Sequence, residues 1–316
     1  MYPPTLEGTT PNKRIKTLRR LSAASQLLFA SLLAVILCLS GLGQAGRRSS
    51  ASTQGGVLLS VVVKRDRELG APITGKQLAL FDNGVQQDIR NLSRDPSPSH
   101  IVLLVDNSLT IRADIDKLEE AAREFAYEIY EGDKLLIVGY DEQAEIVADW
   151  TDNAKAIEAS LRDFRKKGQP HLFDALFAVM DHALRPLAGQ KRVIVVISDG
   201  LDRGSKTSFE KILAELQLQD ITVYCVQAPD RTRGAIRRDV PKPKQVIEKL
   251  AEGTGGSIFP IDQSREAANA ICDELRKSRY VLSYLPSSMP FGETRRLLVL
   301  GDLGITVRSK TMQPPN

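Results

Sequence analysis

The chain of 316 residues is 42% hydrophobic and 26% charged, which is ordinary for a soluble protein of one large domain or two modest ones. Its formal net charge of +4 comes from residues 1–45, and the rest of the sequence holds equal numbers of basic and acidic residues. A neutral body of this kind argues against a protein that binds nucleic acid through a general basic surface.

Residues 1–45 have the pattern of an export signal. A basic stretch at 13–20 precedes an apolar run at 27–39, which has the length of a signal-peptide core and is short for a membrane span. Small residues before and at Ala45 suit cleavage, so we expect a secretory signal peptide, with an uncleaved N-terminal anchor as the alternative. The protein is therefore expected in the periplasm, on the cell surface or outside the cell. Contact with a membrane is expected only if the segment is retained as an inner-membrane anchor.

A linker at 46–56, rich in Ser, Gly, Thr and Arg, leads into β structure at 57–95. A strand is predicted at 57–63. A hairpin is predicted at 78–92, because Asn83-Gly84 supplies the positive φ angles of a tight turn.

An apolar run at 101–105 ends in Asp106-Asn-Ser108-Leu-Thr110. A short, uninterrupted apolar run predicts a strand buried on both faces, as in a parallel sheet. Ligands bind beyond the carboxyl ends of such strands, and the oxygen atoms of Asp106, Ser108 and Thr110 suit Mg²⁺, Mn²⁺ or Ca²⁺ rather than zinc or copper. Taken alone, the same residues also suit the N-terminal cap of a helix.

The segment 99–278 alternates between helix and strand patterns. The connection at 141–143 is too short for a parallel crossover, so the strands on either side of it are expected to be antiparallel. The alternation otherwise predicts a doubly wound, mostly parallel α/β sheet of Rossmann-like type. Helices are predicted at 114–130, 153–165, 172–184, 208–218, 245–252 and 265–278, and strands at 101–105, 134–140, 144–150, 192–198, 221–226 and 257–261.

Residues 279–310 return to β structure, with a strand at 280–285 and a hairpin of strands at 296–300 and 305–308. Neither this segment nor 57–95 holds enough strands to bury a core alone. We therefore expect the two segments to pair into one small β-sandwich, into which the α/β domain of residues 99–278 is inserted.

A second acidic turn, Ser198-Asp199-Gly200-Leu-Asp202, follows the strand at 192–198. Together with the first turn, and in this order, it resembles the von Willebrand factor type A domain and its metal-ion-dependent adhesion site. The whole arrangement is similar to secreted proteins of this kind from acidobacteria. The resemblance implies a bound Mg²⁺, or Mn²⁺ or Ca²⁺, with Ser108 and Thr110 as direct ligands and Asp106 and Asp199 acting largely through water. An exposed Asp or Glu of a protein partner would fill the open position of the ion.

The family has a further Thr on a middle loop, which this sequence lacks. The matching stretch is Gly168-Gln-Pro-His-Leu-Phe-Asp-Ala175, where Pro170 stands in place of the Thr. Gln169 or His171 would have to compensate, although His is a poor ligand for Mg²⁺. We therefore expect a weakened or water-completed site, or no site at all. Asp174 is expected to anchor the start of its helix rather than to touch the ion.

A basic loop follows the strand at 221–226, on the same edge of the sheet. We hypothesise that it helps to hold an acidic partner, and a solvated loop without a function is the alternative. The arginines concerned are Arg231, Arg233, Arg237 and Arg238.

Three functions compete for this sequence. The first is an exported module that binds a protein partner through a divalent cation. The second is a hydrolase that uses Ser108 or a metal-activated water, but Gly-x-Ser-x-Gly and His-Glu-x-x-His motifs are missing, so we expect no enzyme. The third is a metal-free scaffold with a degenerate site.

Cys225 and Cys272 are expected to be buried free thiols, with a disulfide as the alternative.

Overall fold

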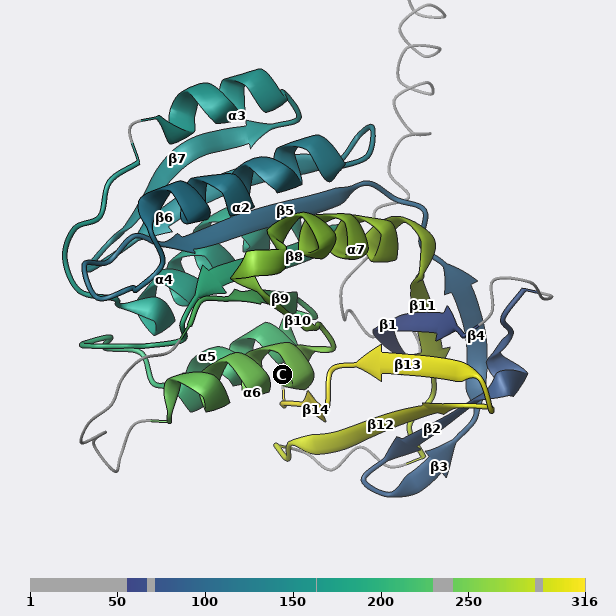
Figure 1. Cartoon of the computed structure of the whole chain (residues 1–316). Helices are drawn as coiled ribbons and strands as arrows, with labels where there is room; N and C mark the ends of the chain where they lie inside the picture. The colour runs from purple at the N-terminus through teal and green to yellow at the C-terminus, as the bar shows by residue number, and fades with distance from the viewer. Residues whose placement is uncertain (1–55, 67–71, 163, 230–240, 288–291, 316) are drawn as a thin grey trace, which may run out of the picture. The chain divides into compact units, whose positions relative to one another are not determined.

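The computed structural model describes residues 56–66, 72–162, 164–229, 241–287 and 292–315 (Figure 1). The predicted signal peptide at 1–45, the linker up to residue 55 and the predicted partner-binding arginines Arg231, Arg233, Arg237 and Arg238 lie outside these residues. Within the described ranges, no helix is both long and apolar enough to cross a membrane.

A six-stranded sheet with the order β10-β9-β8-β5-β6-β7 forms the centre of the α/β unit (Figure 1). Strands β10, β9, β8, β5 and β6 run parallel to one another, and β7 is antiparallel to β6. This arrangement confirms the predicted doubly wound sheet and its antiparallel edge pair. The strands are β5 (Ser99–Asp106), β6 (Lys134–Tyr140), β7 (Ala144–Thr151), β8 (Lys191–Ser198), β9 (Thr222–Gln227) and β10 (Ile258–Pro260).

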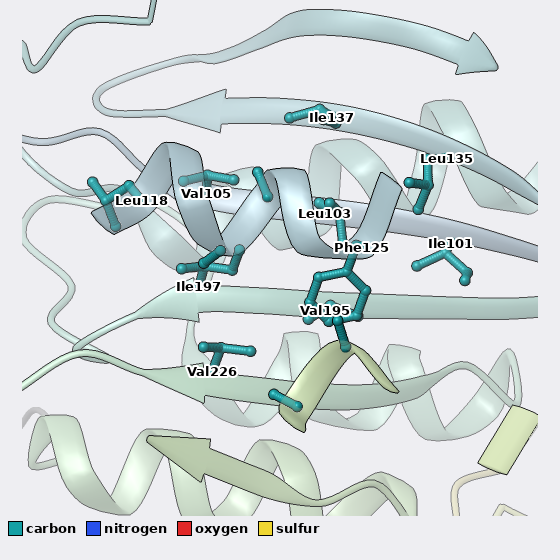
Figure 2. Packing of buried hydrophobic residues seen from close by; sticks show 14 of the residues in the cluster. Ile101, Leu103, Val105, Leu118, Phe125, Leu135, Ile137, Val195, Ile197 and Val226 are labelled. Carbon is teal, nitrogen blue, oxygen red and sulfur yellow. The ribbon is translucent and has the colours of Figure 1, made fainter. Parts of the chain in front are cut away.

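Helices cover both faces of this sheet, because successive residues of a strand point to opposite sides. Ile101, Leu103 and Val105 of β5 belong to one buried cluster, part of which is drawn in Figure 2. Val102 and Leu104 belong to the cluster on the other face. The first cluster is covered by α2 (Ile115–Glu128), α3 (Ala154–Leu161) and α7 (Ser264–Lys277), and the second by α4 (Leu172–Ala178), α5 (Phe209–Leu218) and α6 (Pro243–Thr254).

Two helices end four or more residues before their predicted ends. The helix expected at 172–184 remains α-helical only to Ala178, and then continues as a π-helical turn, Val179–Leu184, and a 3₁₀ turn, Arg185–Leu187. Pro186 in that last turn has no N–H to donate, so an α-helix cannot continue there. The helix expected at 153–165 ends at Leu161, where the chain turns to bury Phe164.

Strands from both flanks of the α/β unit build a β-sandwich, as predicted. One sheet has the order β13-β1-β11-β4 and the other β14-β12-β2-β3. Leu59, Val61, Leu80 and Leu282 are fully buried between them. The strands are β1 (Val57–Arg65), β2 (Leu78–Asp82), β3 (Val85–Gln87), β4 (Ile89–Arg94), β11 (Arg279–Tyr284), β12 (Arg295–Gly301), β13 (Ile305–Ser309) and β14 (Met312–Gln313).

The topology corrects both predicted hairpins. Asn83 and Gly84, with φ angles of 50° and 81°, do join β2 to β3, but the strand expected at 85–92 divides at Asp88, and β4 belongs to the other sheet. The hairpin expected at 296–308 is wrong, because β12 pairs with β2 and β14 whereas β13 pairs with β1. The chain turns a corner between the two sheets at Gly301, where a Cβ atom would lie 2.5 Å from the carbonyl oxygen of Ile305.

A buried polar joint connects the sandwich to the α/β unit. Glu274 of α7 is 3% exposed. Its carboxylate accepts a hydrogen bond from the Tyr224 hydroxyl at 2.6 Å and pairs with Lys64 at 2.6 Å and with Arg308. A buried charge is tolerated when it is paired and hydrogen-bonded in this way. The joint therefore ties β1 and β13 of the sandwich to α7 and β9 of the α/β unit.

Cys225 of β9 and Cys272 of α7 are free and buried, as expected. They belong to the clusters on opposite faces of the central sheet. Burial raises the pKa of both thiols well above the ordinary value.

We expect iodoacetamide to leave Cys225 and Cys272 unmodified in the native protein, because the thiolate is the reactive form and both side chains are buried. Peptide mass spectrometry after alkylation at mildly alkaline pH measures the modification, and alkylation in guanidinium chloride is the positive control. Rapid labelling of either thiol in the native protein would contradict its burial.

Candidate functional site

Three strand ends meet at the carboxyl edge of the central sheet. Strands β6, β5 and β8 are neighbours that end in Tyr140, Asp106 and Ser198. The Oδ2 atom of Asp106 accepts hydrogen bonds from Ser198 Oγ at 3.0 Å and from the Tyr140 hydroxyl at 3.2 Å. The Tyr140 hydroxyl also lies 2.9 Å from Ser198 Oγ, so its one proton is shared between these two acceptors. A carboxylate, a phenol and a hydroxyl therefore form one closed cluster beneath the edge.

Burial dominates the electrostatics of this cluster. It raises the pKa of the Asp106 carboxyl, while hydrogen bonds from Ser108, Ser198 and Tyr140 act in the opposite direction. Burial also raises the pKa of Tyr140 well above its ordinary value, and the charges of Asp106 and Asp199 add to this shift. The charge of Asp199 therefore acts on the Tyr140 hydroxyl, as the charge of Asp106 does.

The loop after β5 brings the two predicted hydroxyl ligands together. The Oδ1 atom of Asp106 accepts the N–H of Ser108 at 2.9 Å, which turns the loop back toward the strand end. Ser108 Oγ and Thr110 Oγ1 lie 3.1 Å apart. In octahedral coordination at about 2.1 Å, adjacent ligand oxygens lie ~3.0 Å apart. The spacing of the two hydroxyls therefore fits two neighbouring ligands of one small cation.

Asp199 begins the loop after β8 and is 2% exposed. Its Oδ1 atom accepts the N–H of Leu201 at 2.9 Å, and the N–H of Gly200 donates to Ser198 Oγ at 3.0 Å. Gly200 has a φ angle of 84°, and a Cβ atom there would lie 2.4 Å from the carbonyl oxygen of Pro243. A glycine is therefore required where this loop passes the start of α6.

The middle loop lies against both of the other loops. Leu109 N–H donates to the carbonyl oxygen of Gly168 at 3.1 Å. Pro170 is buried, and its carbonyl oxygen accepts the N–H of Arg203 at 2.7 Å. Pro170 therefore offers no side-chain oxygen to an ion, as predicted, but it fixes the middle loop to the loop after β8.

His171 and Asp174 both contact neighbouring loops. The His171 N–H donates to the carbonyl oxygen of Asp141 at 2.8 Å, and its ring packs against Gly204, where a Cβ atom would lie 2.7 Å from Nε2. The Asp174 carboxylate accepts the N–H groups of Lys206 and Thr207, both at 2.9 Å. Asp174 thus anchors the segment before α5 rather than the start of α4. Partial burial opposes ionisation of Asp174, but the backbone hydrogen bonds outweigh it and lower the pKa.

Tyr140 and Ser198 also belong to the site, although the sequence patterns did not predict them as members of it. Each is the last residue of a strand next to β5, so strand order was the signal that could have found them. Asp202, which the second acidic turn includes, accepts the N–H of Phe173 at 3.1 Å and the hydroxyl of Ser205 at 2.6 Å. Asp202 therefore has a role in holding the loops together.

The side chains proposed as metal ligands at this edge all offer oxygen atoms. In the part of the chain that the structure describes, no three His, Cys, Asp or Glu side chains form a group that could hold a metal ion. The predicted ligand set contains only two carboxylates, from Asp106 and Asp199, with two hydroxyls. Such a set suits a hard divalent cation and not zinc or copper.

Residues 101–201 match the family model of the von Willebrand factor type A domain. The match starts in β5 and ends at residue 201, so it includes the loop after β5, the middle loop and the first residues of the loop after β8. The chain therefore carries a von Willebrand factor type A domain, as the resemblance of its two acidic turns predicted.

Several solved structures are similar to the chain. An aerotolerance-related membrane protein from Bacteroides fragilis has 18% identity and a TM-score of 0.44, with 57% of this chain and 99% of that chain covered. A von Willebrand factor type A protein from Catenulispora acidiphila has 12% identity and a TM-score of 0.46, with 84% and 76% covered. Proximal thread matrix protein 1 from the mussel byssus has 14% identity and a TM-score of 0.46, with 58% and 49% covered. No curated protein matches the chain.

Proposed function

We propose that this protein is an exported binding module that holds a protein partner through a divalent cation at the edge of the central sheet. Ser108 and Thr110 would bind Mg²⁺, Mn²⁺ or Ca²⁺ through their hydroxyls, and Asp106 and Asp199 would act largely through water. The observation that carries the proposal is the 3.1 Å spacing of Ser108 Oγ and Thr110 Oγ1. Export is supported by the signal pattern of residues 1–45.

The chemistry of the site favours an acidic ligand. A divalent cation supplies a concentrated positive charge with a coordination position that a carboxylate oxygen can take. The direct ligands, Ser108 and Thr110, are neutral and leave most of that charge available. The Asp106 carboxylate is held in one orientation by Ser108, Ser198 and Tyr140. An exposed Asp or Glu of a partner is therefore the group that this edge suits.

The same contacts support a binding role over hydrolysis. A nucleophilic serine needs a base within hydrogen-bond reach. The Asp106 carboxylate, to which Ser108 is hydrogen-bonded, is assigned to the ion in this proposal. The ring of His171, the one histidine on these loops, packs against Gly204. We therefore propose a protein that is not an enzyme.

Pro170 favours a second candidate function, that of a metal-free scaffold. Its ring replaces the Thr that the family resemblance leads one to expect, and its carbonyl joins two loops directly. In this alternative the loops hold one another without an ion, and partners dock on the protein surface irrespective of divalent cations.

We expect Mg²⁺ and Mn²⁺ to bind the purified protein and to raise its unfolding temperature. At a free ion concentration about a hundredfold above Kd, binding to the folded state alone stabilises by about 2.7 kcal/mol. Isothermal titration calorimetry and thermal unfolding measure the two effects. Asp106→Ala should abolish both, whereas Asp88→Ala, which removes an exposed carboxylate of the sandwich, should change neither. If the unsubstituted protein binds no ion, the scaffold function replaces the cation-dependent one.

A further inference from the structure

Leu109 is an exposed apolar residue inside the proposed cation site. Its side chain is 64% exposed, whereas the preceding Ser108 is fully buried. The backbone of Leu109 is held in place, because its N–H donates to Gly168 O at 3.1 Å and the hydroxyls of Ser108 and Thr110 on either side are hydrogen-bonded to each other. Scattered apolar side chains are common on protein surfaces. Leu109 differs from these because it stands between two proposed ligands, so a group bound by the ion would come close to it.

The loops around Leu109 add a positive rim. The loop at 165–168 runs beside the loop after β5, because Lys167 N–H donates to Asn107 O at 2.8 Å. Among the described residues of the loops at this edge, exposed basic side chains outnumber exposed acids. The exposed acids among them are Asp114 and Glu142. The exposed basic residues include Arg112, Arg165, Lys167, Arg203 and Lys206, of which Lys167 pairs with Glu145.

We propose that Leu109 selects partners in which an apolar residue directly neighbours the Asp or Glu that approaches the cation. This inference rests on the proposed function. Contact between two apolar side chains removes both from water, which stabilises the complex in proportion to the area buried. It also excludes water from the carboxylate, where attraction to a cation is stronger in a lower dielectric. The positive rim favours a segment that is acidic beyond that one residue.

The partner class that follows is an acidic protein segment with an aliphatic side chain beside its key carboxylate. Leu109 would be the apolar anchor of the contact, and anchors of this kind contribute most when polar contacts surround them. The rim residues would increase the rate of association and make it sensitive to salt.

The test compares two acetylated and amidated tetrapeptides, Gly-Leu-Asp-Gly and Gly-Ser-Asp-Gly, titrated into the full protein in Mg²⁺ and followed by calorimetry. We expect the leucine peptide to bind roughly five- to tenfold more tightly, as partial burial of two leucine side chains predicts. Leu109→Ser should remove this preference while Mg²⁺ binding persists, and Leu109→Met should retain it.

The possible outcomes separate this inference from the proposed function. Equal Mg²⁺-dependent binding of both peptides would overturn the role of Leu109 and leave the cation site in place. A preference that survives Leu109→Ser would overturn it as well. Absence of Mg²⁺ binding in the unsubstituted protein would overturn the proposed function, and the inference with it. Loss of the preference in Leu109→Ser and its retention in Leu109→Met would support both.

Discussion

Gly200→Ala is expected to destabilise the protein by about 3 kcal/mol and to abolish binding of Mg²⁺. The residue has a φ angle of 84°, and a Cβ atom would lie 2.4 Å from the Pro243 carbonyl oxygen and 2.7 Å from Ile247 Cγ1. The left-handed backbone costs an alanine about 1 kcal/mol, and crowding in a packed region costs ~1–3 kcal/mol more. Relief of the contact must move the loop that carries Asp199, so the proposed ion site changes together with stability.

Gly84→Ala is the matched control for this substitution. Gly84 has a φ angle of 81°, close to that of Gly200, but no atom lies within 4 Å of an added Cβ. We expect Gly84→Ala to destabilise the protein only by the cost of a left-handed backbone, about 1 kcal/mol. The affinity for Mg²⁺ should not change. Urea unfolding and calorimetry measure both variants. Equal destabilisation by the two would show that the contact with Pro243 contributes nothing.

Glu274→Ala is expected to destabilise the protein by about 3 kcal/mol, because removal of one partner of a buried ion pair leaves the others uncompensated. Tyr224 is fully buried and would lose the acceptor of its hydroxyl, while Arg308 and Lys64 would lose their carboxylate. Arg308 and Lys64 are 27% and 45% exposed, so water compensates them in part. This places the expected value at the lower end of the range for buried pairs.

Lys277→Ala on the same helix is the control. Lys277 pairs with Asp273 at 2.7 Å on the exposed face of α7, and exposed pairs contribute little to stability. We expect no measurable change in the urea midpoint of this variant. If Glu274→Ala behaved in the same way, the buried joint would not be a source of stability.

The sequence predicted the α/β unit well because its signals are local. Uninterrupted apolar runs such as 101–105 indicate strands buried on both faces, and the short turn at 141–143 requires an antiparallel pair. The predictions are wrong where strand pairing depends on residues far apart in the sequence. Nothing near Gly301 indicates that β12 and β13 belong to different sheets, because the choice depends on their partners β2 and β1. The division at Asp88 has the same origin.

The residues proposed to bind the ion could be predicted from the sequence, but the residues that hold them in place could not. Asp106, Ser108 and Thr110 stand together in the sequence, and Asp199 follows a similar strand. Tyr140 and Ser198 join them only through the side-by-side order of β6, β5 and β8. The role of Pro170 was predicted only as the loss of a hydroxyl. Its carbonyl contact with Arg203 depends on the path of two loops, which residue types do not determine.

The pairing of β1 has a consequence for how this protein is made. Both neighbours of β1 in its sheet, β11 and β13, lie near the other end of the described chain. Contacts between residues so far apart in sequence form slowly, because a long loop must close before they are gained. During synthesis β1 therefore leaves the ribosome long before its partners exist, as a strand with apolar side chains at Leu59, Val61 and Val63. An unpaired apolar strand is prone to aggregation, so the nascent chain carries this risk until β13 has been made.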